Sequence, residues 1–318
     1  MPAPPPTSPW LYLGFTAGVL ALAGAELLLS ARRPEPPTVR RAAIWSAVWV
    51  GAALGFGGWL GHVRGHEDAL AYGAAYLTEE SLSLDNMIVF VTIFAYFGIP
   101  TAFQQRVLLW GILGAIVMRF LFIFAGVGLL NRFYWLVYLF GALLIYTGLK
   151  MAFQREESLD PGANPALKVL RRFLPMTHEA NDQNFFVRIN GALHATPLFA
   201  TLLVVEFSDL IFAADSIPAV LAVSRDTFVV YTSNVFAIMG LRALYFLLAN
   251  LMGLFRFLKV GISVILIFVG AKMAGGLWFH IPISVSLCVI AGILCASIAA
   301  SLLAGPRSRP QDLPAQDQ

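Results

Sequence analysis

Long apolar segments separated by short polar ones run through almost the whole chain. A helix needs about 20 mostly apolar residues to cross the hydrocarbon core of a bilayer. By that measure the pattern predicts nine spanning helices, at residues 10–30, 42–61, 70–97, 107–130, 133–151, 195–223, 228–251, 259–277 and 281–303. The fold class that we expect is therefore all-α, a polytopic membrane protein.

The polar residues concentrate at the two ends and in one internal segment. Five prolines among the first nine residues predict a disordered tail at 1–9, and the polar end predicts another at 304–318. Residues 152–194 form the long internal polar segment. Its piece NPALKVLRRFLPM is weakly amphipathic, so it fits a helix on the membrane surface, and a solvated loop fits as well.

Composition supports a membrane protein and excludes a soluble globular enzyme. Hydrophobic residues make up 58% of the chain and charged residues 12%, whereas a soluble domain carries about 25% charged residues. The two cysteines, Cys288 and Cys295, lie seven residues apart on one apolar segment. That spacing indicates neither a disulfide nor a CxxC metal site. We expect no nucleic-acid partner and no organic cofactor.

The basic residues predict the orientation in the membrane. If the N-terminus lies outside, fifteen of the 21 lysines and arginines fall in the inner loops and ends. Four fall outside, at Arg64, Arg132, Arg225 and Lys272, and two lie within spans. Inner loops of membrane proteins are rich in Lys and Arg. The N-terminus is thus expected outside, with residues 152–194 and the C-terminus in the cytoplasm.

Acidic residues occur inside the predicted spans, where each charge costs about 2.5–3.5 kcal/mol on insertion scales. There are seven: Glu26, Glu79, Glu80, Asp85, Glu206, Asp209 and Asp215. The two arginines within spans, Arg119 and Arg242, cannot neutralise all of them, so the excess must be protonated or bound to cations. Carboxylates, amides and hydroxyls are hard oxygen ligands that suit Mn²⁺, Ca²⁺ or Mg²⁺. The alternative is a set of interhelical ion pairs that only hold the helices together.

Two parts of the chain resemble each other. Aligning Asp85 with Asp215 also aligns Glu79 with Asp209, each pair being 130 residues apart. In the same order, Arg119 corresponds to Arg242 and Lys150 to Lys272. Because each part holds three spans, residues 70–151 and 195–277 would be two repeats of opposite orientation. Transporters built in this way bind substrate near the midplane, between the repeats. Two peripheral helices at 10–61 precede the repeats, and the last span follows them.

Local sequence predicts a break in both acidic helices. Pro218 lies three residues after Asp215 and removes a backbone donor. The polar side chains of Ser81, Ser83 and Asn86 surround Asp85 and compete for backbone hydrogen bonds. We therefore expect local unwinding near Asp85 and Asp215, which would free carbonyl oxygens as further ligands.

Two weaker features remain. His62 and His66 stand near Glu67 and Asp68, where they form a possible outer metal site, although solvated polar side chains explain this short loop more simply. Several glycines within the spans are expected to permit close contact between helices. They are Gly111, Gly114, Gly141, Gly240 and Gly270.

Three long motifs resemble the TerC family of integral membrane proteins. They are YLTEESLSLDN at 76–86, TPLFATLLVVEFSDLIFAADSIPA at 196–219 and YTSNVFAIMGLRALYFLL at 231–248. The resemblance covers roughly residues 40–275. It implies a protein of the cytoplasmic (inner) membrane linked to Mn²⁺ efflux and metal homeostasis, in a family named after tellurite-resistance operons.

The resemblance also implies which residues line an ion path. They are Glu79, Asp85, Asn86, Glu206, Asp209 and Asp215. Further candidates for the ion path are Glu80, Ser83, Ser216 and Glu26, and Arg119 and Arg242 would compensate charge.

Three functions compete. The first is a secondary exporter of divalent cations, foremost Mn²⁺ with Ca²⁺ left open, driven by protons or Na⁺. The second is an intramembrane aspartyl protease, in which two aspartates share a proton, but no GxGD motif follows either aspartate, and we do not expect an enzyme. The third is a non-transporting scaffold that binds protein partners through residues 152–194. The oligomeric state stays open.

Overall fold

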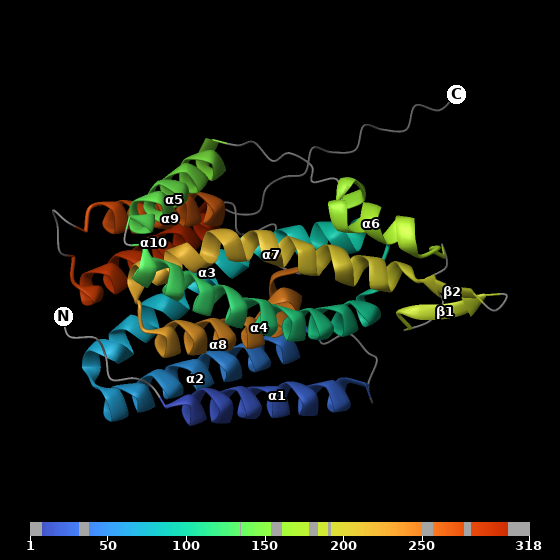
Figure 1. Ribbon diagram of the computed structural model, residues 1–318, viewed down its shortest axis with the longest axis horizontal. Helices are drawn as coiled ribbons and strands as arrows, with labels where there is room; N and C mark the ends of the chain where they lie inside the picture. The colour runs from blue at the N-terminus through green and yellow to red at the C-terminus, as the bar shows by residue number, and fades with distance from the viewer. Residues whose placement is uncertain are drawn as a thin grey trace.

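The computed structural model describes residues 8–31, 38–133, 135–153, 161–177, 184–189, 192–249, 257–276 and 281–304. Helices dominate this part of the chain (Figure 1). In chain order the elements are α1 (Pro9–Ala31), α2 (Val39–Arg64), α3 (His66–Tyr96), α4 (Thr101–Arg132), α5 (Leu136–Phe153), the 3₁₀ turn η1 (Pro161–Ala163), α6 (Pro165–Phe173), β1 (Phe186–Ile189), β2 (Ala192–Ala195), α7 (Pro197–Val223), α8 (Thr227–Ala249), α9 (Leu258–Ala274) and α10 (Ile283–Ala304).

A helix lies at each of the nine predicted positions, and α6 is the additional one. Within the described residues, six helices are long and apolar enough to cross a membrane: α2, α4, α5, α7, α8 and α10. The other three fall short of that standard for different reasons. In α1 only the apolar stretch Pro9–Leu22 has its side chains continuously described, α3 carries acidic residues in its middle, and α9 has 17 residues. The chain is thus a polytopic membrane protein.

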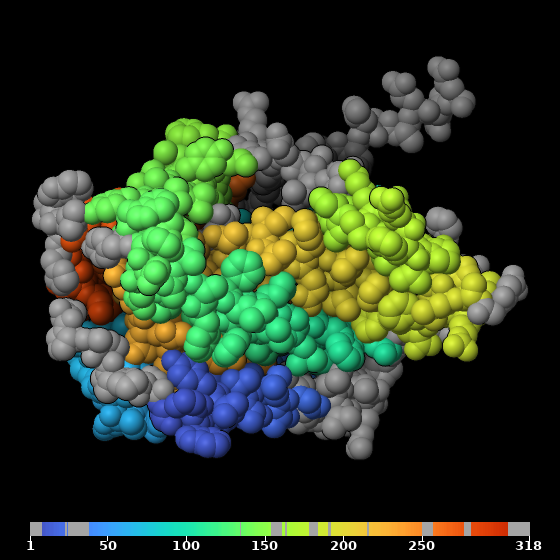
Figure 2. All heavy atoms as spheres, in the orientation of Figure 1, coloured from blue at the N-terminus to red at the C-terminus, as the bar shows by residue number. Residues whose placement is uncertain are grey.

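The long helices pack in pairs. α3 lies against α8, α4 against α7, and α5 against α9. α2 covers α3 and α8, and α10 packs on α3 and α9. Figure 2 shows α4 on one face of the molecule, between α1 and α7. The four helices α3, α4, α7 and α8 therefore surround a common centre.

The degree of enclosure separates inner from outer helices. In the most apolar part of α8, 72% of residues are buried inside the protein, against 22% for α2 and 11% for α10. Large apolar side chains such as Leu54, Leu121 and Leu303 are exposed on the protein surface. In a bilayer such side chains face lipid, which is as apolar as they are. α8 is thus a core helix, and α2 and α10 lie at the lipid-facing edge.

The predicted unwinding of the two acidic helices is wrong. α3 continues through Asp85, and α7 continues through Asp215 with Pro218 inside it. The hydroxyls of Thr78 and Ser81 donate to carbonyls four residues earlier on α3, at 2.7 and 2.6 Å. These hydroxyls bond to carbonyls of their own helix, and the helix continues through them without unwinding.

The internal polar segment contains structure that the all-α prediction lacked. β1 and β2 form an antiparallel hairpin that pairs Phe186 with Ala195. In the sequence the strands are joined by Asn190 and Gly191, a dipeptide that strongly favours two-residue hairpin turns. The expected amphipathic helix is present as α6, which packs against α7. The hairpin leads directly into α7, whose first turn is capped by the side chain of Thr196. We call this end of the molecule the hairpin end.

Close helix contact is confirmed where α5 crosses α9. A Cβ atom on Gly141 would lie 2.9 Å from the carbonyl oxygen of Gly270, and one on Gly270 would lie 2.7 Å from that of Gly141. Since real Cβ atoms do not come so near a backbone oxygen, both positions require glycine. Residues 1–7 and 305–318, which hold most of the two predicted tails, lie outside the described residues.

Candidate ion site

A single buried arginine connects four helices at the centre of the protein. Arg119 on α4 forms an ion pair with Glu79 on α3. Its Nη1 also donates to Oγ of Ser216 on α7, at 2.9 Å, and to Oδ1 of Asn234 on α8, at 2.7 Å. Its Nη2 lies 3.6 Å from Oδ1 of Asp209 on α7. We call these five residues the Arg119 network.

The network is sealed from solvent. The exposed fraction is 1% for Arg119, 0% for Glu79 and 0% for Asn234. Moving a charge to such a place costs several kcal/mol per ion unless partners compensate it. One arginine shared by two carboxylates compensates one negative charge, so the network holds a surplus of carboxylate.

Several polar atoms around the network are buried without a hydrogen-bond partner among the described residues. They are Oε2 of Glu79, Oδ2 of Asp209 and Nε of Arg119, with Oε2 of Glu80 and Oγ of Ser83 farther along α3. Buried polar atoms in proteins almost always have a partner, whether protein, water or ion. The unsatisfied oxygens are therefore candidate ligands for water or for a cation.

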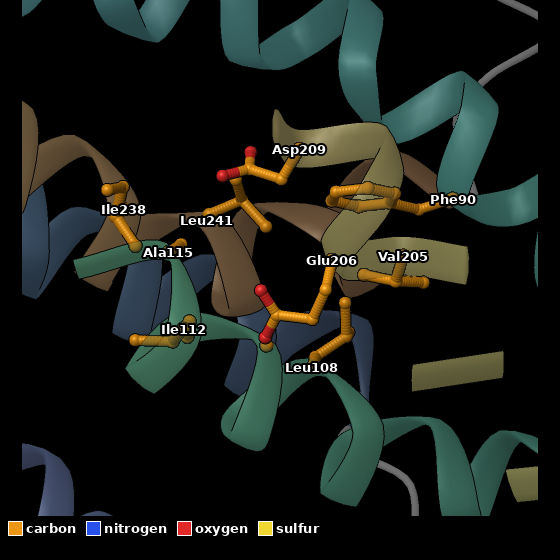
Figure 3. Close-up of a pocket in the computed structure, with 10 residues that line it drawn as sticks. Phe90, Leu108, Ile112, Ala115, Val205, Glu206, Asp209, Ile238 and Leu241 are labelled. Carbon is orange, nitrogen blue, oxygen red and sulfur yellow. The ribbon is translucent and has the colours of Figure 1, made fainter. Parts of the chain in front are cut away.

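A small pocket opens beside the network, with about 20 Å³ of space for a water-sized body. Glu206 and Asp209 of α7 direct their carboxylates into it (Figure 3). Its other walls come from α3, α4 and α8, and they are apolar, with Phe90, Ile112 and Leu241 among them. Two carboxylates in an otherwise apolar pocket are the common pattern of a small-ligand site.

The pocket lies on the hairpin side of the network. On α4, which begins near the hairpin end, the pocket residues Leu108 and Ala115 come before Arg119. On α8, which runs the other way, the pocket residue Leu241 comes after Asn234. Asp209 belongs both to the pocket and to the network. A ligand arriving from the hairpin end would thus meet Glu206 and Asp209 before Arg119.

The structure places the remaining predicted residues in different surroundings. Asp85 and Asn86 follow Ser83 on the hairpin side of Glu79, with Asn86 buried and Asp85 half-buried. Lys259, near the start of α9, acts electrostatically on Asp85. Arg242 on α8 is half-buried. The side chains of the two other predicted acids, Glu26 and Asp215, lie outside the described residues.

The described side chains include no group of three His, Cys, Asp or Glu residues close enough to hold a metal ion. The described side chains include those of Glu79, Asp209 and Glu206 but not that of Asp215. A divalent cation bound by this arrangement would need a ligand beyond those, such as Asp215 or water.

One member of the network, Asn234, was not among the predicted site residues. Its amide lies on α8, and it also donates to its own helix at the carbonyl of Val230, at 3.2 Å. The signal in the sequence is the run Thr232-Ser233-Asn234 within an otherwise apolar span. A polar residue there indicates a buried partner, but the sequence does not say which one.

A second ion cluster closes the end of the molecule opposite the hairpin. Arg64, the last residue of α2, lies 2.9 Å from Asp68 and donates to both carboxylate oxygens of Asp226. Its guanidinium also stands 5.8 Å from the ring of Phe228. Gly65 makes this possible, because its φ of 104° joins α2 and α3 through a single residue.

The possible outer metal site gains no support among these residues. His62 and His66 are exposed at the same end as the Arg64 cluster. The neighbouring Asp68 is engaged by Arg64. Solvated polar side chains remain the simpler interpretation of the two histidines.

Comparison with known proteins gives a consistent result. The model of the Integral membrane protein TerC family matches residues 64–309. A protein of Escherichia coli strain K12 named "Putative membrane-bound redox modulator Alx" is 47% identical over 296 residues, which is 90% of this chain and 92% of that protein. The uncharacterized membrane protein STKORF319 of Myxococcus xanthus is also 47% identical, over 93% of each chain. An uncharacterized membrane protein of Rickettsia bellii is 36% identical over 90% of this chain and 94% of its own length. No solved structure matches.

Proposed function

Because this chain belongs to the TerC family of integral membrane proteins, we propose that it is a secondary transporter that exports divalent cations, foremost Mn²⁺, from the cytoplasm. The observation that carries the proposal is the surplus of buried carboxylate around Arg119. Oε2 of Glu79 and Oδ2 of Asp209 lack a partner among the described residues. Hard oxygen atoms of this kind suit Mn²⁺ or Ca²⁺.

Packing between α5 and α9 supports the two inverted repeats. With an offset of 122 residues between the repeats, Lys150 corresponds to Lys272 and Gly148 corresponds to Gly270. A Cβ atom on Gly148 would touch Ser263 and Ile267, and one on Gly270 would touch Gly141 and Ile145. Adding 122 to 141 and 145 gives 263 and 267, so the two sets of contacts are related by the same shift. Such a relation is expected of a pseudo-two-fold axis between α5 and α9.

The helix pairs agree with this symmetry. If α3, α4 and α5 correspond to α7, α8 and α9, the pair α3–α8 corresponds to the pair α7–α4. Both pairs pack closely. The Arg119 network lies where these pairs meet, which is the interface at which inverted-repeat transporters bind their substrates.

The proposed path starts at the hairpin end. Because cytoplasmic loops are rich in Lys and Arg, we infer that the hairpin end faces the cytoplasm. The start of α1 and the Arg64 cluster would then lie on the outer side. A cytoplasmic cation then reaches Glu206 and Asp209 in the pocket. Binding there competes with Arg119 for Asp209, which lies 3.6 Å from the guanidinium. When the cation leaves, Arg119 returns to the vacated carboxylate and restores the empty site.

Rocking of one repeat against the other would expose the site on the outer side. Proton exchange is the natural driving reaction, because a desolvated carboxylate that loses its cation takes up a proton. A Na⁺ gradient would serve as an alternative. Asp85 and Asp215, at equivalent positions of the repeats, would complete the ligand set.

The name of the Escherichia coli relative, "Putative membrane-bound redox modulator Alx", does not conflict with this proposal. A membrane-bound redox modulator acts directly through thiols or a cofactor, or indirectly through a redox-active cation such as Mn²⁺. The two cysteines are exposed on the lipid-facing helix α10, away from the buried acids. The scaffold hypothesis makes a different prediction, because its function would survive neutralisation of the buried acids and would depend on α6 and the hairpin.

Transport into proteoliposomes that contain a Mn²⁺-quenched dye tests the proposal. With a proton or Na⁺ gradient applied, wild-type protein should quench the dye, and Asp85→Asn and Asp215→Asn should abolish quenching. Glu67→Gln, which removes an exposed acid at the outer end, is the matched control and should transport normally. If folded wild-type protein moves no divalent cation under either gradient, the transporter proposal fails and the scaffold hypothesis takes its place.

A further inference from the structure

The carboxylate of Glu206 lies in a notch on the surface of α4, made by two glycines one turn apart. A Cβ atom built on Gly114 would lie 2.5 Å from both Cδ and Oε2 of Glu206 and closer still to Oε1. One built on Gly111 would lie 4.0 Å from Oε1 of Glu206 and 3.7 Å from Val205. The carboxylate thus occupies the space that a side chain at position 114 would fill, and it only borders position 111.

Glu206 has no competing partner in the described part of the protein. Among the described residues, none of the hydrogen bonds or ion pairs of the Arg119 network reaches it, whereas Asp209, three residues later, is close to Arg119. Its neighbours in the pocket are mainly apolar. The position of the Glu206 carboxylate is therefore determined by shape, through the absence of a side chain on α4, and not by a salt bridge.

We propose that Gly114 is a positioning residue, which sets the Glu206 carboxylate at the wall of the pocket so that it is the first ligand met by a divalent cation entering from the hairpin end. This inference rests on the proposed function. The affinity of the pocket for the cation would then depend on Gly114, a residue that has no polar side chain. Glu206 and Asp209 lie at i and i+3, on one face of α7, so the placement of the first carboxylate also determines its separation from the second.

The substitution Gly114→Ala distinguishes positioning from folding. Its methyl group would collide with the far end of a flexible side chain, not with backbone. The chain can thus keep its fold by turning Glu206 away, at the expense of the carboxylate's position. Gly111→Ala is the matched control, because it adds the same methyl group one turn away at ordinary contact distances.

Mn²⁺ binding by purified protein in detergent, measured by calorimetry, is the first measurement. Gly114→Ala should weaken binding about tenfold or more and Gly111→Ala less than about twofold. In the Glu206→Asp background, whose shorter side chain does not reach the notch, Gly114→Ala should have little further effect. Such non-additivity is the signature of direct coupling between two positions. Equal Mn²⁺ affinity of wild type and Gly114→Ala, or additive effects of the two substitutions, would overturn the proposal.

Transport in inverted membrane vesicles, which present the cytoplasmic face to added Mn²⁺, is the second measurement. Gly114→Ala should raise KM and leave kcat nearly unchanged, because the entry ligand is displaced and later steps are intact. A wild type that binds Mn²⁺ without transporting it would refute the proposed function and leave the positioning role to be decided by the binding data. An effect of Gly114→Ala on kcat alone would refute the positioning role and leave transport standing.

If Gly114→Ala does not fold, the double variant Gly114→Ala/Glu206→Ala decides the question. Removing the carboxylate removes the collision, so recovery of folded protein, measured by size-exclusion chromatography, supports the notch. Failure to recover would show that the added methyl group meets something other than Glu206, and the inference would fall.

Discussion

Asn234 and Arg119 are joined by a 2.7 Å hydrogen bond in the centre of the protein, so a neutral amide on α8 shares the arginine with the acids of α3 and α7. A carboxylate at position 234 would have tied the guanidinium more tightly, while an apolar side chain would have removed one of the three acceptors that Nη1 faces. The amide satisfies the donor without adding charge. This arrangement suits a site in which Arg119 must release Asp209 when a cation arrives.

The first prediction concerns that amide. Asn234→Leu should lower the free energy of unfolding by about 1–3 kcal/mol, because it removes a hydrogen bond to a buried charged group. Ser233→Ala is the matched control, since within the described part of the chain Ser233 bonds to its own helix, at the carbonyl of Val230. Thermal unfolding in detergent should show a clearly larger drop for Asn234→Leu. Equal drops would mean that the amide contributes nothing specific.

The second prediction concerns the arginine itself. Arg119→Lys keeps the positive charge but offers a single ammonium group in place of a planar fork that reaches four partners. The free energy of unfolding should fall, and the rate of Mn²⁺ uptake should fall by more than about tenfold. Arg119→Gln should be more severe, because removing one partner of a buried pair costs about 3–5 kcal/mol.

A compensating variant separates the charge effect from shape. Combining Arg119→Gln with Glu79→Gln removes both members of the ion pair and should recover much of the lost thermal stability. Transport should stay absent, because the ligand set is then incomplete. If the double variant were no more stable than Arg119→Gln alone, Arg119 and Glu79 would not be coupled in the folded protein.

The third prediction concerns the outer end. Asp226 has two roles: it pairs with Arg64, and its carboxylate accepts a hydrogen bond from N–H of Val229 at the start of α8, at 2.9 Å. Asp226→Asn keeps the helix cap and loses the charge, whereas Asp226→Ala loses both. The loss of stability should be about 1–3 kcal/mol for Asn, because Arg64 loses a largely buried charged partner and keeps Asp68, and about 1 kcal/mol greater for Ala.

Added salt provides the check on this separation. The side chains of Arg64 and Asp226 are only 13% and 9% exposed, so salt screens this pair less than an exposed one, and the difference between wild type and Asp226→Asn should shrink only modestly at high ionic strength. The difference between Asn and Ala should persist, because a cap hydrogen bond depends little on screening. Thermal unfolding curves at low and high salt measure both differences. Equal stability of wild type and Asp226→Asn at both salt concentrations would remove the ion pair from the account.

The sequence predicted helix positions well, because each span is a long apolar run whose ends are marked by polar residues. It also named Glu79, Asp209 and Arg119 as candidate site residues, since charges within spans are costly and need a reason. The structure brings these three together, and their role in an ion path stays a prediction. The sequence did not predict which acid would meet which arginine. That depends on how α3, α4, α7 and α8 cross, and no local pattern encodes the crossing.

Two errors arose from local rules. The polar side chains near Asp85 were expected to unwind α3, but Thr78 and Ser81 bond within their own helix. The hairpin was missed because residues 152–194 were judged by polarity alone, although Asn190-Gly191 between alternating residues is a hairpin signal. The notch that holds Glu206 could not be predicted from the sequence. Gly114 indicates only that α4 permits a close neighbour, and not that the neighbour is a carboxylate.

The fourth prediction tests the symmetry between the repeats. Gly148→Ala and Gly270→Ala both place a methyl group against backbone of the partner helix, with the nearest carbonyl oxygens at 2.8 and 2.7 Å. Since backbone cannot turn aside as a side chain can, each substitution should lower the free energy of unfolding by about 1–3 kcal/mol. Gly128→Ala on α4, which has open space around its Cβ position, should be neutral.

Equivalent positions of a two-fold arrangement should lose similar amounts of stability, so similar losses at 148 and 270 would support the inverted repeats. A large loss at one position and none at the other would mean that the contacts of α5 and α9 resemble each other without being related by symmetry.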